Sequence, residues 1–310
     1  MTIGPMTIAP MTALQWRQSE IAVPQDLQSV GVVGSGTMGS GIAQAFASAG
    51  YDVTMRDISR DQLDRAMTNI SSSLDRLVAR NKLTAQGREA TLSRIHTVAE
   101  LDRLSKCQIV VEAIVENFEI KTALINELDA ICTEETIFAT NTSSISVTSV
   151  AACSKNPSRV IGMHFFNPVP LMQLVEIIRA LQTSDAVCDR VVALSRSLGK
   201  SARVSKDSPG FVVNRVLVPM INEAINCLQE GLAPAQDIDE MMKLGASHPM
   251  GPLSLADLVG LDVVLHVMET LYKGFNDPKF RPSQLLKQMC DAGYLGRKTG
   301  RGFFEYPRQA

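Results

Sequence analysis

Through the first two thirds of the chain, short apolar runs alternate with longer segments whose apolar residues recur every three or four positions. A short apolar run predicts a buried strand, and the longer spacing predicts an amphipathic helix. Strands are expected at 30–33, 51–56, 108–113, 136–140, 160–165, 174–178 and 201–204, and helices at 40–49, 61–81, 119–132 and 190–198. This alternation predicts an α/β fold with a doubly wound, mostly parallel sheet.

The pattern changes after residue 207. Beyond it no convincing strand appears before the extreme C-terminal end, and helices are expected at 211–229, 234–244, 261–272 and 283–291. We therefore expect a sheet domain over residues 27–207 and a smaller all-helical domain over residues 208–310, which is an ordinary domain size. Residues 1–26 contain the near-repeat MTIGP and MTIAP without a targeting pattern, and we expect them to be a disordered extension.

A glycine-rich turn joins the first expected strand to the first helix. Its G-x-G-x-x-G motif consists of Gly34, Gly36 and Gly39, and Thr37 and Met38 lie inside it. The first glycine permits a tight turn, the second lets backbone approach a pyrophosphate, and the third lets helix and strand pack closely. Because a strand precedes the motif and a helix and a strand follow it, the motif predicts a Rossmann-type dinucleotide site.

Asp57 ends the second expected strand, about 20 residues after the glycine turn begins. A carboxylate at this place binds the ribose hydroxyls of the adenosine and repels a 2′-phosphate, which favours NAD over NADP. Arg56 and Arg60 weaken this preference without reversing it.

Polar side chains also lie near the carboxyl ends of later strands, where open α/β sheets bind ligands. Asn141 and Ser143 follow one strand, His164 lies near the end of another, and Glu176 lies in the next apolar run. A purely structural alternative makes His164 a core residue and Glu176 an edge residue. Considered jointly, His164 and Glu176 instead predict a His–Glu pair that takes the proton of an alcohol. No metal-ligand spacing is apparent, so we expect no metal site.

Three basic residues gather at the end of the long expected helix. Arg76 and Arg80 are four residues apart, and Lys82 follows them. A solvated basic face and a clamp for phosphate groups both account for such a cluster, and the composition alone does not decide between them.

Charge and composition exclude some classes of partner. The formal net charge of −2 argues against nucleic acid or an anionic membrane as the main partner. No apolar run reaches the roughly 18 residues that span a bilayer. The six cysteines are scattered without a C-x-x-C pair, which is typical of reduced thiols, so we expect a cytoplasmic protein.

Several motifs occur in the order found in one known family. They are the glycine motif with Asp57, and segments 141–144, 162–170, 208–215 and 296–303. In these motifs the chain resembles the L-3-hydroxyacyl-CoA dehydrogenase family, from about residue 28 to the C-terminus. The resemblance implies a homodimeric enzyme that interconverts an L-3-hydroxyacyl-CoA, of short chain such as 3-hydroxybutyryl-CoA, and the 3-ketoacyl-CoA with NAD.

The resemblance also implies roles for residues at matching positions. His164 is the expected catalytic base and Glu176 its partner, while Ser143 and Asn214 bind the C3 oxygen of the substrate. The expected cofactor contacts are Gly34, Gly36, Thr37, Met38, Gly39, Asp57, Glu116, Lys121, Ser143 and Lys298. The expected coenzyme A contacts are Arg76, Arg80 and Lys82.

Two other interpretations remain open from the sequence. The same fold also suits a dehydrogenase of a free hydroxy acid or sugar acid, but the basic cluster at Arg76 and Arg80 then has no obvious purpose. A non-catalytic NAD-binding protein is the third interpretation, and the complete catalytic set argues against it.

Overall fold

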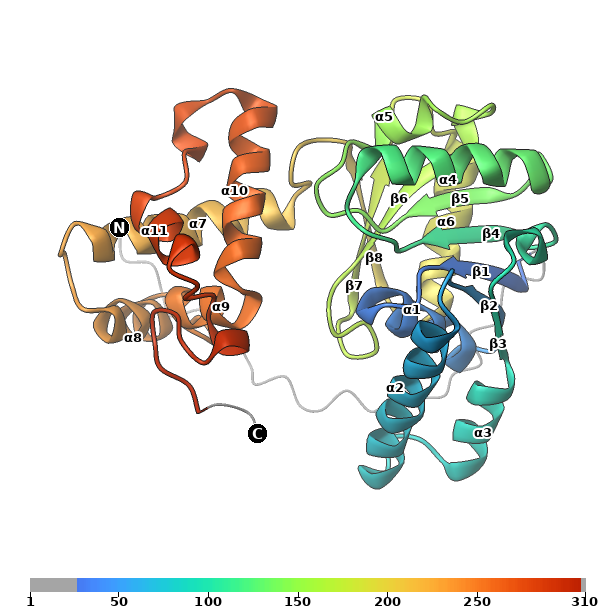
Figure 1. The fold of residues 1–310 in the computed structure, drawn as a ribbon, viewed down its shortest axis with the longest axis horizontal. Coiled ribbons are helices and arrows are strands. Elements are labelled where there is room, and N and C mark those ends of the chain that lie inside the picture. Colours follow the sequence, from blue (N-terminus) through green and yellow to red (C-terminus); the bar gives the residue numbers. More distant parts are fainter. Residues whose placement is uncertain (1–26, 308–310) are drawn as a thin grey trace, which may run out of the picture.

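The computed structural model describes residues 27–307, and its larger part is built on one eight-stranded sheet (Figure 1). The order is β3-β2-β1-β4-β5-β6-β7-β8. The strands are β1 (Ser29–Val33), β2 (Asp52–Arg56), β3 (Ile95–Val98), β4 (Ile109–Glu112), β5 (Ile137–Thr140), β6 (Val160–Phe165), β7 (Leu174–Arg179) and β8 (Ser201–Lys206). Neighbouring strands are parallel except for the antiparallel pair β6 and β7. The predicted mostly parallel α/β fold is confirmed, whereas the expected extension over residues 1–26 lies outside the described residues.

Helices cover both faces of this sheet. One face carries α1 (Thr37–Ser48), α2 (Arg60–Ala79), α3 (Ala85–Ser93) and α6 (Asp185–Ser197), and the other carries α4 (Phe118–Ile131) and α5 (Val147–Ala151). Each face has its own buried cluster, with Phe46 and Leu74 in the first and Leu128 and Val150 in the second. Burial of these apolar stripes holds the helices on the sheet. We call this part the sheet domain.

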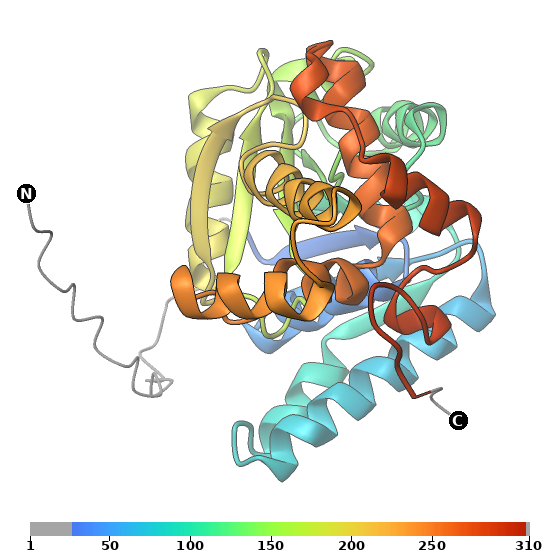
Figure 2. The same ribbon diagram turned by 90° about the vertical axis from the view of Figure 1, so that its left-hand side faces the viewer.

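A second group of helices has a separate core (Figures 1 and 2). These helices, here called the helical domain, are α7 (Val213–Gln229), α8 (Ala235–Gly245), α9 (Pro252–Val259), α10 (Leu261–Phe275) and α11 (Gln284–Asp291). Their core includes Ile225, Leu253 and Met268, all fully buried.

Short 3₁₀ turns occur in both domains. They are η1 (Leu101–Leu104) and η2 (Pro157–Arg159) in the sheet domain, and η3 (Pro278–Phe280) and η4 (Arg297–Thr299) in the helical domain. Within residues 27–307, no helix is long and apolar enough to cross a membrane.

Four elements were not expected from the apolar pattern: β3, α3, α5 and α9. In α3, Thr91 is the buried residue, and β3 is a four-residue edge strand with two exposed positions. Helices α5 and α9 are only five and eight residues long, and such short elements carry too little periodicity for the pattern to mark them. Near the C-terminal end the structure has two isolated bridges, Gly296–Arg301 and Arg301–Glu305.

Candidate active site

The glycine turn lies between β1 and α1, at the point where the strand order reverses between β2 and β4. Gly34 has φ of +96°, a conformation that L side chains rarely adopt. A Cβ on Gly39 would lie 1.8 Å from the Gly34 carbonyl oxygen, so the turn can close only with glycine there. A Cβ on Gly36 would meet nothing within 4 Å, which leaves open space before Thr37 and Met38 in the first turn of α1. Open space at a helix N-terminus fits a pyrophosphate.

Asp57 lies beside this turn and lines a cavity of about 690 Å³. Its carboxylate accepts hydrogen bonds from the Ser35 backbone N–H and hydroxyl, both at 2.8 Å, and from the Ser59 N–H at 3.1 Å. Burial raises the pKa of Asp57, but these hydrogen bonds outweigh burial and hold the pKa below its usual value. Apolar residues line the same cavity: Ile58, Val115, Ile120 and Leu124. An ionised acceptor beside an apolar wall fits the ribose and base of a dinucleotide.

The predicted His–Glu pair forms across two neighbouring strands. His164 on β6 lies directly opposite Glu176 on β7, and His164 Nδ1 is 2.9 Å from Glu176 Oε2. Both residues are buried, and the imidazole ring packs against Phe166 and Phe211 with ring centroids 4.6 and 5.6 Å away. Because an ionised carboxylate only accepts hydrogen bonds, Nδ1 carries a proton, and in the neutral ring Nε2 is then the atom with the lone pair.

The second oxygen of Glu176 is held by the segment that leads into the helical domain. Glu176 Oε1 accepts from the backbone N–H groups of Val212 and Val213, at 3.2 and 3.1 Å. Burial raises the pKa of Glu176, but the bonds from His164 and these N–H groups hold it below its usual value. Asn214, the expected substrate contact, follows Val213 in the first turn of α7. These two backbone contacts to Glu176 could not be predicted from the sequence, because every residue except proline has a backbone N–H.

The loop after β5 carries Ser143 and is organised by Glu116. Glu116 Oε1 accepts from the backbone N–H groups of Ser143 and Ser144, both at 3.0 Å, and from the hydroxyls of Ser144 and Thr142 at 2.8 and 2.6 Å. Asn141 Oδ1 accepts from the Phe165 N–H at 2.8 Å, which ties this loop to the end of β6. The expected residues Asn141, Ser143 and His164 are therefore brought to one edge of the sheet.

Lys121 lies beneath Glu116 rather than on an open surface. Its side chain is 1% exposed, and its Nζ is 2.6 Å from Glu112 Oε1 and 3.3 Å from Glu116 Oε2. Burial raises the pKa of Glu116, but Lys121 and the hydrogen bonds of the loop hold it below its usual value. The cofactor contacts expected for Glu116 and Lys121 stay predictions, and the structure adds that Lys121 supports Glu116.

Lys298 lies in the helical domain, where its Nζ is 2.5 and 2.6 Å from the two carboxylate oxygens of Asp262. Both side chains are about half exposed, at 47% and 45%. An exposed ion pair is weak and exchanges readily for another partner. The cofactor contact expected for Lys298 stays a prediction.

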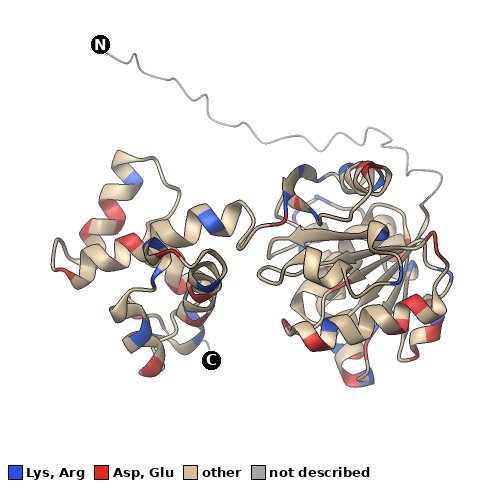
Figure 3. Ribbon diagram, turned by 90° about the horizontal axis from the view of Figure 1, so that it is seen from above, with Lys and Arg blue, Asp and Glu red and all other residues tan. Residues whose placement is uncertain are grey.

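The basic cluster lies at the end of α2, on the surface. Helix α2 ends at Ala79, two residues before the expected end, and Asn81 has φ of 53°, which terminates the helix. Arg76, Arg80 and Lys82 are exposed and form no ion pair with residues 27–307. Both signs of charge occur over the helices (Figure 3), and the three cations of this cluster are close together at one helix end.

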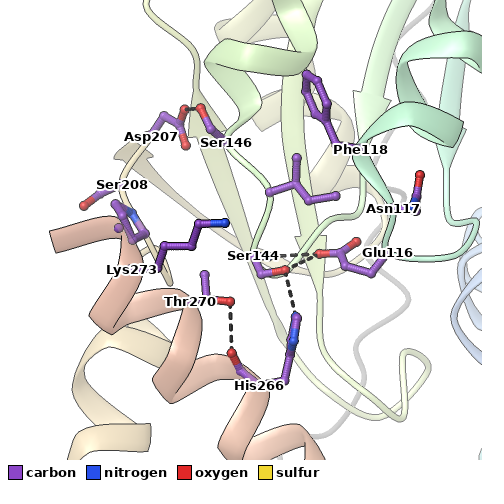
Figure 4. Close-up of a pocket in the computed structure, with 13 residues that line it drawn as sticks. Glu116, Asn117, Phe118, Ser144, Ser146, Asp207, Ser208, His266, Thr270 and Lys273 are labelled. Carbon is purple, nitrogen blue, oxygen red and sulfur yellow. Dashed lines mark hydrogen bonds between the residues drawn. The ribbon is translucent and has the colours of Figure 1, made fainter. Parts of the chain in front are cut away.

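A second cavity, of about 720 Å³, lies between the two domains. Glu116 and Ser144 line it from the sheet domain, and His266, Thr270 and Lys273 line it from α10 (Figure 4). The Ser144 hydroxyl is 3.5 Å from His266 Nε2. Nothing in the sequence pattern marked these α10 residues, because their polar character is ordinary for an exposed helix face.

Both parts of the chain match models of a known protein family. The model for "3-hydroxyacyl-CoA dehydrogenase, NAD binding domain" matches residues 29–208, and the model for its C-terminal domain matches residues 210–306. A probable 3-hydroxybutyryl-CoA dehydrogenase of Deinococcus radiodurans is 51% identical over 89% of this chain and 99% of its own length. The 3-hydroxybutyryl-CoA dehydrogenase of Bradyrhizobium diazoefficiens is 48% identical over 90% of this chain and 96% of its own.

Solved structures agree with these matches. The crystal structure of (S)-3-hydroxybutyryl-CoA dehydrogenase from Ralstonia eutropha has a TM-score of 0.89 and 53% identity, covering 91% of this chain and 100% of that chain. The matched regions include the glycine turn with Asp57 and the His164–Glu176 pair. The chain therefore belongs to the 3-hydroxyacyl-CoA dehydrogenase family, with NAD as its cofactor.

Proposed function

We propose that this enzyme interconverts an L-3-hydroxyacyl-CoA and the corresponding 3-ketoacyl-CoA, with a short acyl chain as in 3-hydroxybutyryl-CoA. The observation that carries the proposal is the buried His164–Glu176 pair, at 2.9 Å, beside the loop that holds Ser143. The names of the similar enzymes support the substrate class. Bound NAD supplies the nicotinamide ring that exchanges the hydride.

The residues of the pair divide the proton chemistry between them. In oxidation, His164 Nε2 takes the proton of the C3 hydroxyl, and in reduction it returns the proton. Glu176 accepts from Nδ1 and so fixes the ring tautomer and stabilises the imidazolium. Ser143 and Asn214 are proposed to hydrogen-bond the C3 oxygen, which orients the substrate before the proton moves.

The nucleotide of coenzyme A is proposed to bind at Arg76, Arg80 and Lys82. Replacing both arginines with alanine should raise KM for acetoacetyl-CoA by about fivefold or more while kcat stays nearly unchanged, because remote contacts act alike on ground and transition states. The effect should shrink with added salt, since exposed charges are screened over about 10 Å at 0.1 M ionic strength.

Acetoacetyl-pantetheine thioester, which lacks the nucleotide, is the control substrate for this double variant. Its KM should hardly change. An equal rise for both substrates would show that the arginines support the fold or the closure of the domains, and the cluster would then be a solvated basic face.

Asp57 is proposed to select NAD by binding the adenosine ribose. Replacing Asp57 with Ser should narrow the preference for NADH over NADPH by about tenfold, because the 2′-phosphate no longer meets an ionised carboxylate. Values of kcat/KM for the two coenzymes measure the change. A wild-type enzyme that already uses NADPH as well as NADH would contradict the role of Asp57.

We propose the division at residues 27–207 and 208–310, with the helical domain completing the substrate cleft and forming a homodimer in the cytoplasm. Support for the dimer comes from apolar side chains left exposed on the helical domain, among them Val216 (68%), Met241 (63%) and Leu244 (77%). Sedimentation equilibrium tests this, and a mass of one chain at micromolar concentration would contradict it.

The proposed reaction is tested by the consumption of NADH in the presence of acetoacetyl-CoA. Turnover with acetoacetyl-CoA but not with free acetoacetate supports the proposal. Turnover of free hydroxy acids or sugar acids alone would favour the second interpretation. Tight NADH binding without turnover of any of these substrates would favour a non-catalytic NAD-binding protein.

A further inference from the structure

Three ionisable side chains meet at the carboxyl end of β4, and their charges do not cancel. Glu112 ends this strand, Glu116 lies in the loop after it, and Lys121 belongs to α4. Lys121 Nζ is 2.6 Å from Glu112 Oε1 and 3.3 Å from Glu116 Oε2. Within residues 27–307, no other cation pairs with either carboxylate. Two carboxylates therefore share one ammonium group, and these three side chains, here called the β4 ion cluster, have one negative charge in excess.

Glu112 is the deepest carboxylate of this cluster, and its surroundings keep it ionised. Its side chain is 2% exposed, and Oε1 accepts from the Ile114 N–H at 2.8 Å as well as from Lys121. Oε2 accepts from the Thr140 hydroxyl at 2.7 Å. A carboxyl group that faces three donors, one of them an ammonium group, is held in the charged form.

Glu116 carries the β4 ion cluster to the open side of the sheet edge, where it lines the cavity between the domains (Figure 4). Burial raises the pKa of Glu116, but Lys121 and the hydrogen bonds from the loop after β5 outweigh burial and lower it, so Glu116 is ionised as well. Because Lys121 and Glu112 are almost fully buried, solvent and salt screen the excess charge only weakly.

The strand order indicates which half of the dinucleotide lies near this cluster. The pyrophosphate is expected at the turn after β1, and the adenosine ribose at Asp57 after β2. Strand β4 lies on the other side of β1, followed by β5 and by β6, which carries His164. A dinucleotide crosses the carboxyl ends of the strands where their order reverses, so its second half extends over β4 and β5. The nicotinamide end is therefore expected on the side of the β4 ion cluster.

The two forms of the coenzyme differ in charge at this end alone. The nicotinamide ring of NAD⁺ is a cation, whereas the ring of NADH is neutral, and the adenosine halves are identical. A fixed negative charge nearby attracts the oxidised ring and has no comparable effect on the reduced ring. The excess charge thus acts on the difference between the two affinities.

We propose that Glu112, through the excess charge of the β4 ion cluster, determines how strongly the enzyme binds NAD⁺ relative to NADH. Glu112 is then a specificity-determining residue that acts from beneath the site, because a weakly screened charge acts beyond contact distance. The inference rests on the proposed function and adds to it a preference between the two oxidation states of the coenzyme. It concerns binding and no step of the reaction.

Replacing Glu112 with glutamine removes the excess charge and keeps the shape of the side chain. The amide oxygen still accepts from Ile114 and Lys121, and the amide nitrogen donates to the Thr140 hydroxyl, which can also accept. The dissociation constant for NAD⁺ should rise by about threefold to tenfold, the effect of one charge in a partly buried site, and that for NADH by less than about twofold. Fluorescence titration with NADH, followed by displacement with NAD⁺, measures both constants without any acyl-CoA.

Further variants separate the charge of Glu112 from its structural contacts. Glu112→Asp keeps the charge and should keep the wild-type ratio of the two dissociation constants. The double variant Glu112→Gln/Lys121→Met loses one charge of each sign, which restores the excess of one negative charge, and should return the ratio to within about twofold of wild type even if both affinities fall. Glu135→Gln, exposed before β5 at the opposite edge of the sheet, is the matched control and should behave as wild type.

Glu116→Gln replaces Glu112→Gln if that variant does not fold, since it neutralises the same cluster from its exposed side and should shift the ratio in the same direction. An unchanged ratio in the variant used overturns the inference. Equal weakening of NAD⁺ and NADH also overturns it, because the carboxylate then only supports the loop. So does a double variant that keeps the ratio of Glu112→Gln. Absence of turnover with acetoacetyl-CoA and NADH overturns the proposed function instead, and the binding ratio stays measurable.

Discussion

Replacing His164 with alanine is expected to lower kcat by about 10²- to 10⁴-fold, the usual contribution of a positioned proton-transfer group. The ring is held at Nδ1 by Glu176, and its faces pack against Phe166 and Phe211. This leaves Nε2 as the atom that exchanges the proton with the substrate. Alanine removes that atom, and no other histidine is paired in this way within the part of the chain that the structure describes. Steady-state rates with acetoacetyl-CoA and NADH measure the loss.

Affinity for NADH should stay almost unchanged in this variant, because the dinucleotide site is built around the turn between β1 and α1. Fluorescence titration with NADH tests that point. His96→Ala, on an exposed position of β3, is the matched control and should keep wild-type rates. A kcat for His164→Ala within about threefold of wild type would remove His164 from the mechanism.

Replacing Glu176 with glutamine is expected to lower kcat by about 10²- to 10⁴-fold. Glutamine has the same shape, and its oxygen still accepts from the N–H groups of Val212 and Val213. Its amide nitrogen then faces His164 Nδ1 and donates to it. This favours the tautomer with the proton on Nε2, which is the wrong one for a base that must accept a proton there.

The pH dependence distinguishes this electrostatic role from a structural one. Burial raises the pKa of Glu176, but the hydrogen bonds from His164, Val212 and Val213 outweigh burial and hold the pKa below its usual value. Glu176 is therefore ionised in the active enzyme. Its negative charge stabilises the imidazolium, so removing the charge should shift the acid limb of the oxidation profile to lower pH. Thermal unfolding should be little changed. A pH–rate profile that superimposes on wild type would show that the two residues are not coupled.

The sequence by itself determined the local elements of this protein and the order of its two parts. The apolar runs of β1, β4, β5 and β6 and the stripe of α2 arise from spacing within a few residues. The turn from Gly34 to Gly39 is equally local, because its backbone geometry requires glycine. Even the pairing of His164 with Glu176 was accessible, since a short hairpin connects the two strands and restricts their register.

Only the tertiary structure decided which distant groups complete the site. The N–H groups of Val212 and Val213 reach Glu176 across 36 and 37 residues, and a backbone donor has no side chain to reveal it. The family resemblance implies that Lys121 contacts the cofactor, but only the packing of α4 shows that its side chain is buried against Glu112 and Glu116. The cavity between α10 and the loop after β5 likewise exists only where two separately packed domains meet. Contacts of this kind depend on how whole elements are placed, which the spacing of residues along the chain does not encode.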